Sequence, residues 1–481
     1  MLLWKLNNMI CQDAFPFIQQ FLDQITLQLK TINTNFKMTT IQKMWISFCI
    51  MGVFVTGTLC WSQFERYSLG KYSVSALSWM LKRSKIVWDF LLIASVKVIL
   101  LKYSIRSGHL VIDDTDRQRS KSTTEIDKVH KIYDKKTGGY FMGQNIIFLL
   151  LVTDKITIPV GFKFYNPDPK KIAWHKNDEE LRKQKAPKSA RPEPPAYDPK
   201  FPTKIELALK LLAEFNTHFS DVTIQSISAD AAYGSQGFFK KANQIFSKTQ
   251  VISQLRNNQK VFFKGKLIPV SELFLSLPKI SSQIEIRGGE MKSVSISSAR
   301  VRVESHDETQ FVVALKYEGE DEFRYIVASD LSWRAVDIVK AYSLRWLVEV
   351  FISDWKRYEG WGQLALQQGV DGSFRGVVLS LLVDLCLLFH PNQFARIKNK
   401  VPACTVGSLR EQLKNESLLT CFHEILMSDS PMENFAKLKE KFSEFFTTRE
   451  SSKHMINRNL DNLHPSPSLE KKFGRLKLCQ I

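Results

Sequence analysis

Four polar residues early in the last third of the chain have a spacing that suits the cleavage of a phosphodiester. They are Tyr342, Arg345, Glu349 and Lys356. At 100° per residue they fall within about 60° of one another on a helix. Such a face presents a metal-binding carboxylate from Glu349 among a hydroxyl, a guanidinium and an ammonium that suit a phosphate backbone.

The opposite side of the same predicted helix is apolar, so that it can pack on a sheet while the polar side stays accessible. Its members are Leu344, Leu347, Val348, Phe351, Ile352 and Trp355. The same pattern also fits an ordinary amphipathic helix with an Arg345–Glu349 ion pair at i, i+4. Geometry alone leaves both interpretations open.

Further acids follow two short apolar runs of the kind that form buried strands. The run from Gly108 leads to Asp113, Asp114 and Thr115, and the run Val222 to Ala229 leads to Asp230. An aspartate at a strand end is most often only a turn former. Asp113 and Asp116 remain rivals of Asp114 for any chemical role.

The spacing Y-x2-R-x3-E-x6-K resembles the signature of the insertion-sequence-four type of DDE transposase, and all four positions match. The resemblance covers about residues 108–370 and includes the Asp-Asp-Thr and Ala-Asp-Ala-Ala-Tyr-Gly segments. It implies an RNase H-like core in which Asp114, Asp230 and Glu349 are the catalytic, metal-binding acids. It also implies that Tyr342, Arg345 and Lys356 contact DNA.

The resemblance further implies cutting of element ends and joining of 3′-hydroxyls to target DNA. Two Mg²⁺ ions about 3.5–4 Å apart can serve the attacking and the leaving oxygen, and Mn²⁺ can substitute. Mg²⁺ prefers oxygen ligands, so carboxylates suffice. The implied partners are terminal inverted repeats, target DNA and a second copy in a synaptic homodimer.

Related enzymes stack a flipped base on an aromatic residue of their insertion. Here no tryptophan lies between Trp174 and Trp333. Tyr317, Phe323 and Tyr325 are the candidates for that role, although strand aromatics are more often core.

Elements that position these residues follow from the apolar pattern, and they predict an α/β fold. The resemblance implies that the core is an RNase H-like mixed sheet with flanking helices; the pattern predicts that a β-rich insertion interrupts it and that helical regions lie at both ends. The expected segments are a helical DNA-binding region 1–105, a first core part 106–250, an insertion 251–330, a second core part 331–390 and a helical C-terminal region 391–481 with a basic tail.

Within this outline several elements have distinct signals. Residues 64–86 fit a helix-turn-helix that turns at Gly70, with a second helix over 73–85. Runs 140–153 and 156–164 predict a β-hairpin, and 203–219 a helix. Residues 116–137 are predicted to be a loop, and the proline-rich stretch 165–200 an exposed loop or linker.

Strands are expected in the insertion at 251–255, 261–270, 293–303, 310–317 and 323–328, with helices from Arg334 onward. The tail beyond about 447 is polar and basic, which predicts mobility.

Composition narrows the function classes. A net charge of +19 in 481 residues favours a polyanionic partner, nucleic acid before a membrane surface. Seven cysteines without a C-x-x-C pair indicate a reduced cytoplasm rather than disulfides or zinc. The expected location is therefore cytoplasmic, on the nucleoid.

Three alternatives to an active transposase remain. One is an RNase H-like nuclease without strand transfer, and another is a DNA-binding relative without catalysis. The third is a membrane-associated protein built on residues 44–61, which lie in an uncharged stretch long enough to span a bilayer. Hydroxyl and amide side chains dilute that stretch, so we predict a buried helix there and no membrane partner.

Overall fold

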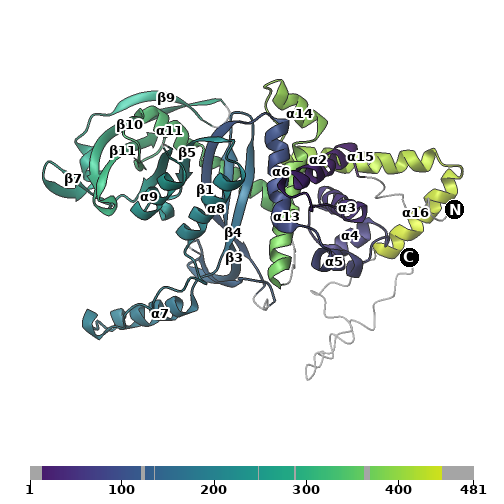
Figure 1. Ribbon diagram of the computed structural model, residues 1–481, viewed down its shortest axis with the longest axis horizontal. Coiled ribbons are helices and arrows are strands. Elements are labelled where there is room, and N and C mark those ends of the chain that lie inside the picture. The colour runs from purple at the N-terminus through teal and green to yellow at the C-terminus, as the bar shows by residue number, and fades with distance from the viewer. Residues whose placement is uncertain are drawn as a thin grey trace, which may run out of the picture.

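Helices make up the first hundred residues of the described chain, as the apolar pattern predicts. The computed structural model describes residues 14–446 except 121–124, 135, 248, 287–288 and 362–368. The helices are α2 (Pro16–Ile32), α3 (Thr40–Thr56), α4 (Trp61–Tyr67), α5 (Val74–Arg83) and α6 (Trp88–Lys102). In Figure 1 they lie together on one side of the central sheet.

The apolar stretch at 44–61 is a buried helix for most of its length. α3 begins at a capping box between Thr39 and Gln42, and it ends at Gly57, whose positive φ of 69° closes the last turn. It packs against α2, α4, α13 and α15. Cys60 and Trp61 therefore lie beyond the helix, which is shorter than predicted.

No single helix in the described part of the chain is long and apolar enough to cross a membrane. The bent pair Asp371–Leu387 and Pro391–Lys398, angled at 59°, meets the length and composition of a span. Most side chains of the first member pack in the core of the protein, including Leu379, Leu381 and Leu385.

Residues 64–86 form two helices joined by a turn, at the positions predicted. Gly70 has a φ of 77° in that turn, and Ser73 caps α5 by accepting a hydrogen bond from the backbone N–H of Ala76. The outer face of α5 exposes Trp79, Lys82 and Arg83, with 60% of Trp79 accessible.

The described strands form one mixed sheet in the order β2-β3-β1-β5-β6-β12-β11-β10-β7-β8, with β4 also paired to β3 and β9 to β10. The strands are β1 (Ser107–Gln118), β2 (His130–Asp134), β3 (Gly139–Val152), β4 (Thr157–Tyr165), β5 (Thr223–Ala229), β6 (Gln250–Leu255), β7 (Lys260–Phe263), β8 (Lys266–Pro269), β9 (Ile280–Ile286), β10 (Glu290–Val303), β11 (Glu308–Tyr317) and β12 (Arg324–Ala328). β1, β5 and β6 are parallel neighbours, whereas β3 and β4 form the predicted antiparallel hairpin.

The insertion is β-rich, as predicted, and it continues the central sheet through the pairing of β12 with β6. One expected strand, 261–270, is instead the hairpin β7–β8. Lys264 and Gly265 turn it with positive φ values of 48° and 75°, which two-residue hairpin loops require. The pattern also missed β9 and the short helix α10 (Val270–Leu275).

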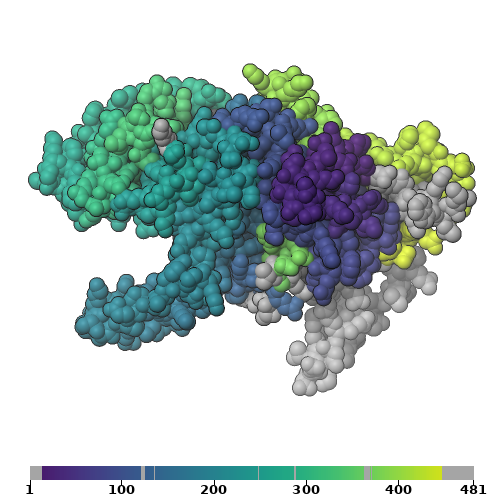
Figure 2. Space-filling view, viewed as in Figure 1, coloured from purple at the N-terminus to yellow at the C-terminus, as the bar shows by residue number. Residues whose placement is uncertain are grey.

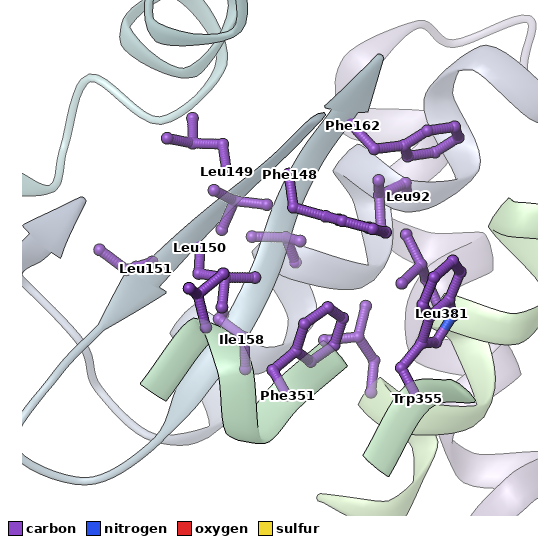
Figure 3. Close-up of a cluster of buried hydrophobic side chains, with 14 of the residues drawn as sticks. Leu92, Phe148, Leu149, Leu150, Leu151, Ile158, Phe162, Phe351, Trp355 and Leu381 are labelled. Atoms are coloured by element: carbon purple, nitrogen blue, oxygen red, sulfur yellow. The ribbon is translucent and has the colours of Figure 1, made fainter. Parts of the chain in front are cut away.

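Helices cover both faces of the sheet. α8 (Lys204–His218) and α9 (Gln236–Ile245) lie on one face, and α11 (Ala335–Ser343), α12 (Trp346–Tyr358) and α13 (Gly369–Leu387) lie on the other. Phe148 of β3 contacts Phe351 and Trp355 of α12, as Figure 3 shows. On the opposite face Gly161 approaches Leu211 of α8, so that a β-carbon there would meet it at 2.9 Å.

The proline-rich stretch contains a helix, which corrects the prediction of a loop or linker. α7 (Pro169–Lys183) projects from the body of the molecule (Figure 1). Asp168 caps it by accepting a hydrogen bond from the Lys170 N–H at 2.8 Å, and Pro169 occupies the first turn. The returning chain packs on it, with Trp174 donating to the Pro192 carbonyl at 2.7 Å. We refer to residues 168–197 as the arm.

Residues 116–137 are also more regular than a loop, because β1 extends to Gln118 and β2 occupies His130–Asp134. The C-terminal region is helical, as predicted, with α14 (Pro391–Lys398), α15 (Val406–Leu426) and α16 (Pro431–Phe445). The basic tail predicted beyond 447 lies outside the described residues. The five cysteines that the structure describes are free thiols.

Candidate active site

Asp113 and Asp230 are brought side by side by two parallel strands. β1 and β5 pair in register up to Ile112 opposite Ala229, so the next residue of each chain segment is an aspartate. β5 ends there, and Asp230 begins the 3-10 turn η2 (Ala231–Tyr233). β1 does not end there but continues to Gln118, because residues 113–118 pair with β3. The predicted strand end at Asp114 is therefore wrong, although both acids lie at this edge.

Asp113 and Asp114 point to opposite faces of the sheet, because successive strand residues alternate. Asp113 lies on the face covered by α12, where its Oδ2 accepts a hydrogen bond from Arg345 Nη1 at 3.0 Å. Asp114 Oδ2 accepts from Lys204 Nζ and from Asn145 Nδ2, both at 2.7 Å.

Arg345 joins Asp113 to Glu349. Its Nη1 binds Asp113 and its Nη2 binds Glu349 Oε1, each at 3.0 Å. The i, i+4 pair that the sequence allows is therefore present, but the same guanidinium also reaches β1. Asp230 acts electrostatically on both Asp113 and Arg345. Two carboxylates, one from β1 and one from α12, thus bind the guanidinium directly, and a third at the end of β5 acts on it electrostatically.

The polar residues of the motif do not sit on one continuous helix, which corrects the sequence prediction. α11 ends at Ser343 and α12 begins at Trp346, so Tyr342 and Glu349 lie on different helices. Backbone N–H groups of Leu344, Arg345 and Val348 bond three residues back, at 3.3, 3.0 and 3.2 Å. This tight turn changes the direction of the chain without a glycine or proline.

Lys356 and Tyr342, both predicted to contact DNA, bind protein groups in this structure, and their contact with DNA stays a prediction. Lys356 Nζ donates to Thr115 Oγ1 and to the Asp116 carbonyl, both at 2.6 Å. Tyr342 is buried and donates to Gln254 Oε1 at 3.0 Å. Arg345 and Lys356 therefore fasten both ends of α12 to β1, which fixes Glu349 relative to Asp113.

Electrostatics single out Asp113 among these acids. The pKa of Asp113 is raised to about 6, mainly by burial and also by the charges of Asp230 and Asp114, although the Asp114 N–H and Arg345 lower it. The raised pKa shows that the positive charge of Arg345 does not fully offset burial and the neighbouring carboxylates. Among the described residues, no side chain forms a hydrogen bond or ion pair with the Asp230 carboxylate.

A divalent cation fits this donor set by its chemistry. Asp113, Asp230 and Glu349 offer only oxygen donors, the type that Mg²⁺ prefers, and Asp113 is half-buried with a raised pKa. As the side chains stand, however, no group of three or more His, Cys, Asp or Glu residues in the described chain is arranged to hold a metal ion. Arg345 lies between Asp113 and Glu349.

Several residues around the site had no assigned role in the sequence reasoning. Asn145 donates to Asp114 and to Asp116 Oδ1, the latter at 2.6 Å, and Tyr233 donates to Asp114 Oδ1 at 3.4 Å. Asn145 could have been singled out from the sequence, since it is a polar residue next to the apolar run of β3. Lys204 had none, because only the fold brings α8 to β1.

Aromatic residues suggested for base stacking lie in or near the insertion strands. Tyr325 is buried, with its ring 5.7 Å from that of Phe274. Tyr317 and Phe323 are partly buried, and Lys316 and Lys279 lie over the Phe323 ring. Their distribution agrees with a packing role, and a stacking role stays a prediction.

Comparisons with solved structures give distant likenesses, among them one to a transposase complex. No family model and no curated protein matches the chain. A solved structure, the synaptic complex of piggyBac transposase with hairpin DNA, matches over 96% of this chain and 91% of its own, with 10% identity and a TM-score of 0.38. A likeness at that TM-score carries no argument about this chain, so function must be argued from its own residues.

Proposed function

We propose that this protein is a DNA transposase that cuts element ends and joins the freed 3′-hydroxyls to target DNA. The observation that carries the proposal is that Arg345 binds both Asp113 and Glu349, while Asp230, next to Asp113 on the neighbouring strand, acts electrostatically on both Asp113 and Arg345. These residues come from three segments more than a hundred residues apart. Four of the surrounding positions also match the transposase motif described above.

The proposal includes an RNase H-like core. Its support is the strand order β4-β3-β1-β5-β6, in which three antiparallel strands are followed by two parallel ones. Acids adjoin two central, neighbouring parallel strands, and a third acid comes from a helix packed across them. Membership in the insertion-sequence-four type is part of the same proposal.

Within the site we propose Asp113, rather than Asp114, as the first metal-binding acid. Asp113 shares its face of the sheet with Glu349 and lies next to Asp230, whereas Asp114 is bound by Lys204 and Asn145 on the opposite face. Asp114 then fixes β1 to α8 and β3. When bound, Mg²⁺ or Mn²⁺ would stabilise the attacking and leaving oxygens of the cleaved phosphate.

Arg345 and Lys356 are positioning residues in this proposal, because each binds β1 directly. Tyr342 anchors the end of α11 through its buried ring and its hydrogen bond to Gln254. Binding of the DNA backbone needs further basic side chains, and the net charge of +19 shows that the chain has them. α5, with exposed Trp79, Lys82 and Arg83, and the tip of the arm are the surfaces we assign to DNA.

The test uses purified full-length protein, Mg²⁺ or Mn²⁺, and a plasmid that carries the DNA flanking the gene on both sides. A second plasmid serves as target. A transposase excises at fixed positions and produces molecules joined to the target, and Asp113→Asn and Glu349→Gln abolish both steps. Sequencing of the junctions identifies the ends.

Two other outcomes separate the rival functions. Cutting without joined products, at positions unrelated to the flanks, would identify a nuclease with the same core. Binding of the flanking DNA with no cutting in either metal would identify a non-catalytic DNA-binding protein. A protein that neither binds nor cuts DNA would contradict all three.

A further inference from the structure

A guanidinium near the end of β1 has no partner among the residues that the structure describes. Arg117 is partly buried, and its Nε is shielded from solvent without a hydrogen bond. Its side chain forms no ion pair with any described residue. Burial lowers the pKa of Arg117, because the charged group loses hydration there. A charge withdrawn from water without a partner costs free energy, which a bound anion can offset.

Arg119, two residues further along the chain, is bound where Arg117 is not. Its Nε and Nη2 donate to Gln144 Oε1 at 3.0 and 2.8 Å, and its guanidinium carbon lies 5.0 Å from the Trp361 ring centroid. Gln144 is the residue paired with Arg117 in the register of β1 and β3. The fold therefore gives to Arg119 the acceptor that lies across the strand from Arg117.

Lys356 places a second positive charge near Arg117. Its ammonium binds Thr115 Oγ1 and the Asp116 carbonyl, and Thr115 shares its face of β1 with Arg117. Burial and the charge of Arg117 lower the pKa of Lys356, while Asp116 raises it. The Asp116 carboxylate itself accepts a hydrogen bond from Asn145. An ammonium has three N–H donors, so one donor of Lys356 remains after its two bonds to β1.

Both cations lie on the face of the sheet that carries the candidate metal-binding acids. Asp113 and Arg117 are four residues apart on one face of β1, which at about 3.3 Å per residue separates their backbones by about 13 Å. Each strand of DNA carries one phosphate per about 3.4 Å of helix axis. A phosphate at Arg117 would therefore lie within about four nucleotides of one held at Asp113.

We propose that Arg117, together with the remaining N–H of Lys356, binds a phosphate group. A guanidinium can bind two phosphate oxygens in parallel, and an ammonium adds a third contact as a point charge. One phosphate would offset both positive charges and give Arg117 the acceptors that it lacks. Lys356 keeps its bonds to β1 in this arrangement.

The source of the phosphate is the DNA backbone, within about four nucleotides of the cleaved bond. This second part rests on the proposed function, whereas the anion site itself does not. Arg117 would hold the strand at a fixed distance from Asp113 without touching the reacting phosphate. It is therefore a substrate-positioning residue.

The first experiment tests the anion site without DNA or metal. The melting temperature of the full-length protein is measured in inorganic phosphate, in pyrophosphate and in chloride at the same ionic strength. Both phosphates should raise it relative to chloride, and Arg117→Gln should remove at least half of that rise. The matched control is Arg357→Gln, which removes an exposed arginine next to Lys356 and should keep the rise.

Stability in chloride alone separates a binding role from a structural one. Arg117→Gln removes a charge that has no partner and lies near another positive charge, so it should melt at the same temperature as the parent or higher. An equal rise with phosphate in all three proteins would overturn the anion site. A variant that melts well below the parent, or does not fold, would make Arg117 a structural residue and overturn it as well.

The second experiment tests the source of the phosphate. Binding of the DNA that flanks the gene is measured over a range of salt concentrations, and Arg117→Gln should reduce the slope of log Kd against log salt by about one. A single neutral methylphosphonate is then placed at each position near the element end. One position should weaken binding by the parent and by Arg357→Gln but leave binding by Arg117→Gln unchanged.

Failure of the DNA test is distinguishable from failure of the anion site. If phosphate stabilises the protein through Arg117 but every methylphosphonate acts equally on all three proteins, the site takes a free phosphate compound and the DNA assignment is wrong. If the protein does not cut DNA at all, the proposed function fails, and the melting experiment still decides the anion site.

Discussion

Arg345 determines the geometry of the candidate site at the scale of single residues. Its guanidinium presents donors in a rigid fork, which allows one side chain to bind a strand carboxylate and a helix carboxylate together. The motif predicted the types of these residues and their closeness in sequence. It did not predict that Arg345 would reach Asp113, because the distance between β1 and α12 depends on how α12 packs on the sheet, which no local pattern reveals.

The assignment of Asp113 makes a prediction that separates it from its neighbour. Asp113→Asn should lower DNA cleavage by about 10³-fold or more, as expected for loss of a metal-binding group. Asp114→Asn should lower it by less than about tenfold, because Lys204 and Asn145 keep other contacts. Initial cleavage rates measure both, with thermal unfolding as the control for folding. The reverse order of effects would assign the metal to Asp114.

Arg345→Lys tests the bridging role. Lysine keeps the positive charge but cannot bind two carboxylates in a fork, so we expect about tenfold slower cleavage or more with DNA affinity unchanged. A binding titration beside the cleavage assay distinguishes the two effects. Slower cleavage caused only by weaker DNA binding would make Arg345 a DNA contact instead of a positioning residue.

At the scale of elements, the apolar side of α12 packs on the sheet, and Arg345 and Lys356 at its two ends bind β1 and fix its orientation. Val348, Phe351 and Trp355 are buried, as the periodicity predicts. The break before Trp346 was not predictable, since no glycine, proline or cap marks it. α7 was predictable in part, because Asp168 followed by Pro169 is typical of a helix start. The prolines after residue 186 favour a loop, and they led to the prediction of a loop for the whole stretch. The length of β1 depended on β3, which no local signal reveals.

A buried acid pair between α12 and α13 should make stability depend on pH. Glu359 ends α12 fully buried, and burial raises its pKa well above the ordinary value. Asp384 of α13 interacts with it, and burial raises the Asp384 pKa to about 7. Asp354 raises both. In the described residues neither oxygen of Glu359 has another hydrogen-bond partner.

These raised pKa values fix the sign of the effect. The folded protein binds protons that the unfolded chain releases near pH 4, so stability is full at low pH and falls as pH rises through about 7. The melting temperature should therefore fall between about pH 4 and about pH 7 because of Asp384, and Glu359 should extend the fall to higher pH. Asp384→Asn should flatten that drop, whereas Asp371→Asn, an exposed acid on the same helix, should leave it unchanged. An equal slope in all three proteins would contradict the prediction.

At the scale of the whole molecule, one sheet connects the candidate site to the insertion, with the arm projecting separately (Figure 2). The net charge predicted a polyanionic partner, and the strand pattern predicted the β-rich insertion. They did not predict the continuity of the sheet, because the pairing of β12 with β6 joins segments about seventy residues apart.

The tip of the arm should contribute to DNA affinity through charge. Lys185 and Lys188 are exposed there, between Arg182 and Arg191. Replacing both lysines with glutamine should weaken binding similarly for all DNA sequences and reduce the salt dependence of log Kd by about one to two units. Lys398→Gln with Lys400→Gln removes the same charge near α14 and should have a smaller effect. If both pairs of substitutions weaken binding equally, the arm contributes only through the net charge of the protein and not as a specific DNA-binding surface.

The parallel pairing of β1 with β5 has a consequence for the chain while it is still being synthesised. Asp113 and Asp230 are translated well before Arg345, which binds Asp113, and before Glu349 of α12. An incomplete chain on the ribosome, or a product truncated before residue 349, therefore holds at most two of the three acids. If the protein cuts DNA as proposed, this order of assembly keeps unfinished copies harmless to the chromosome beside which they are made.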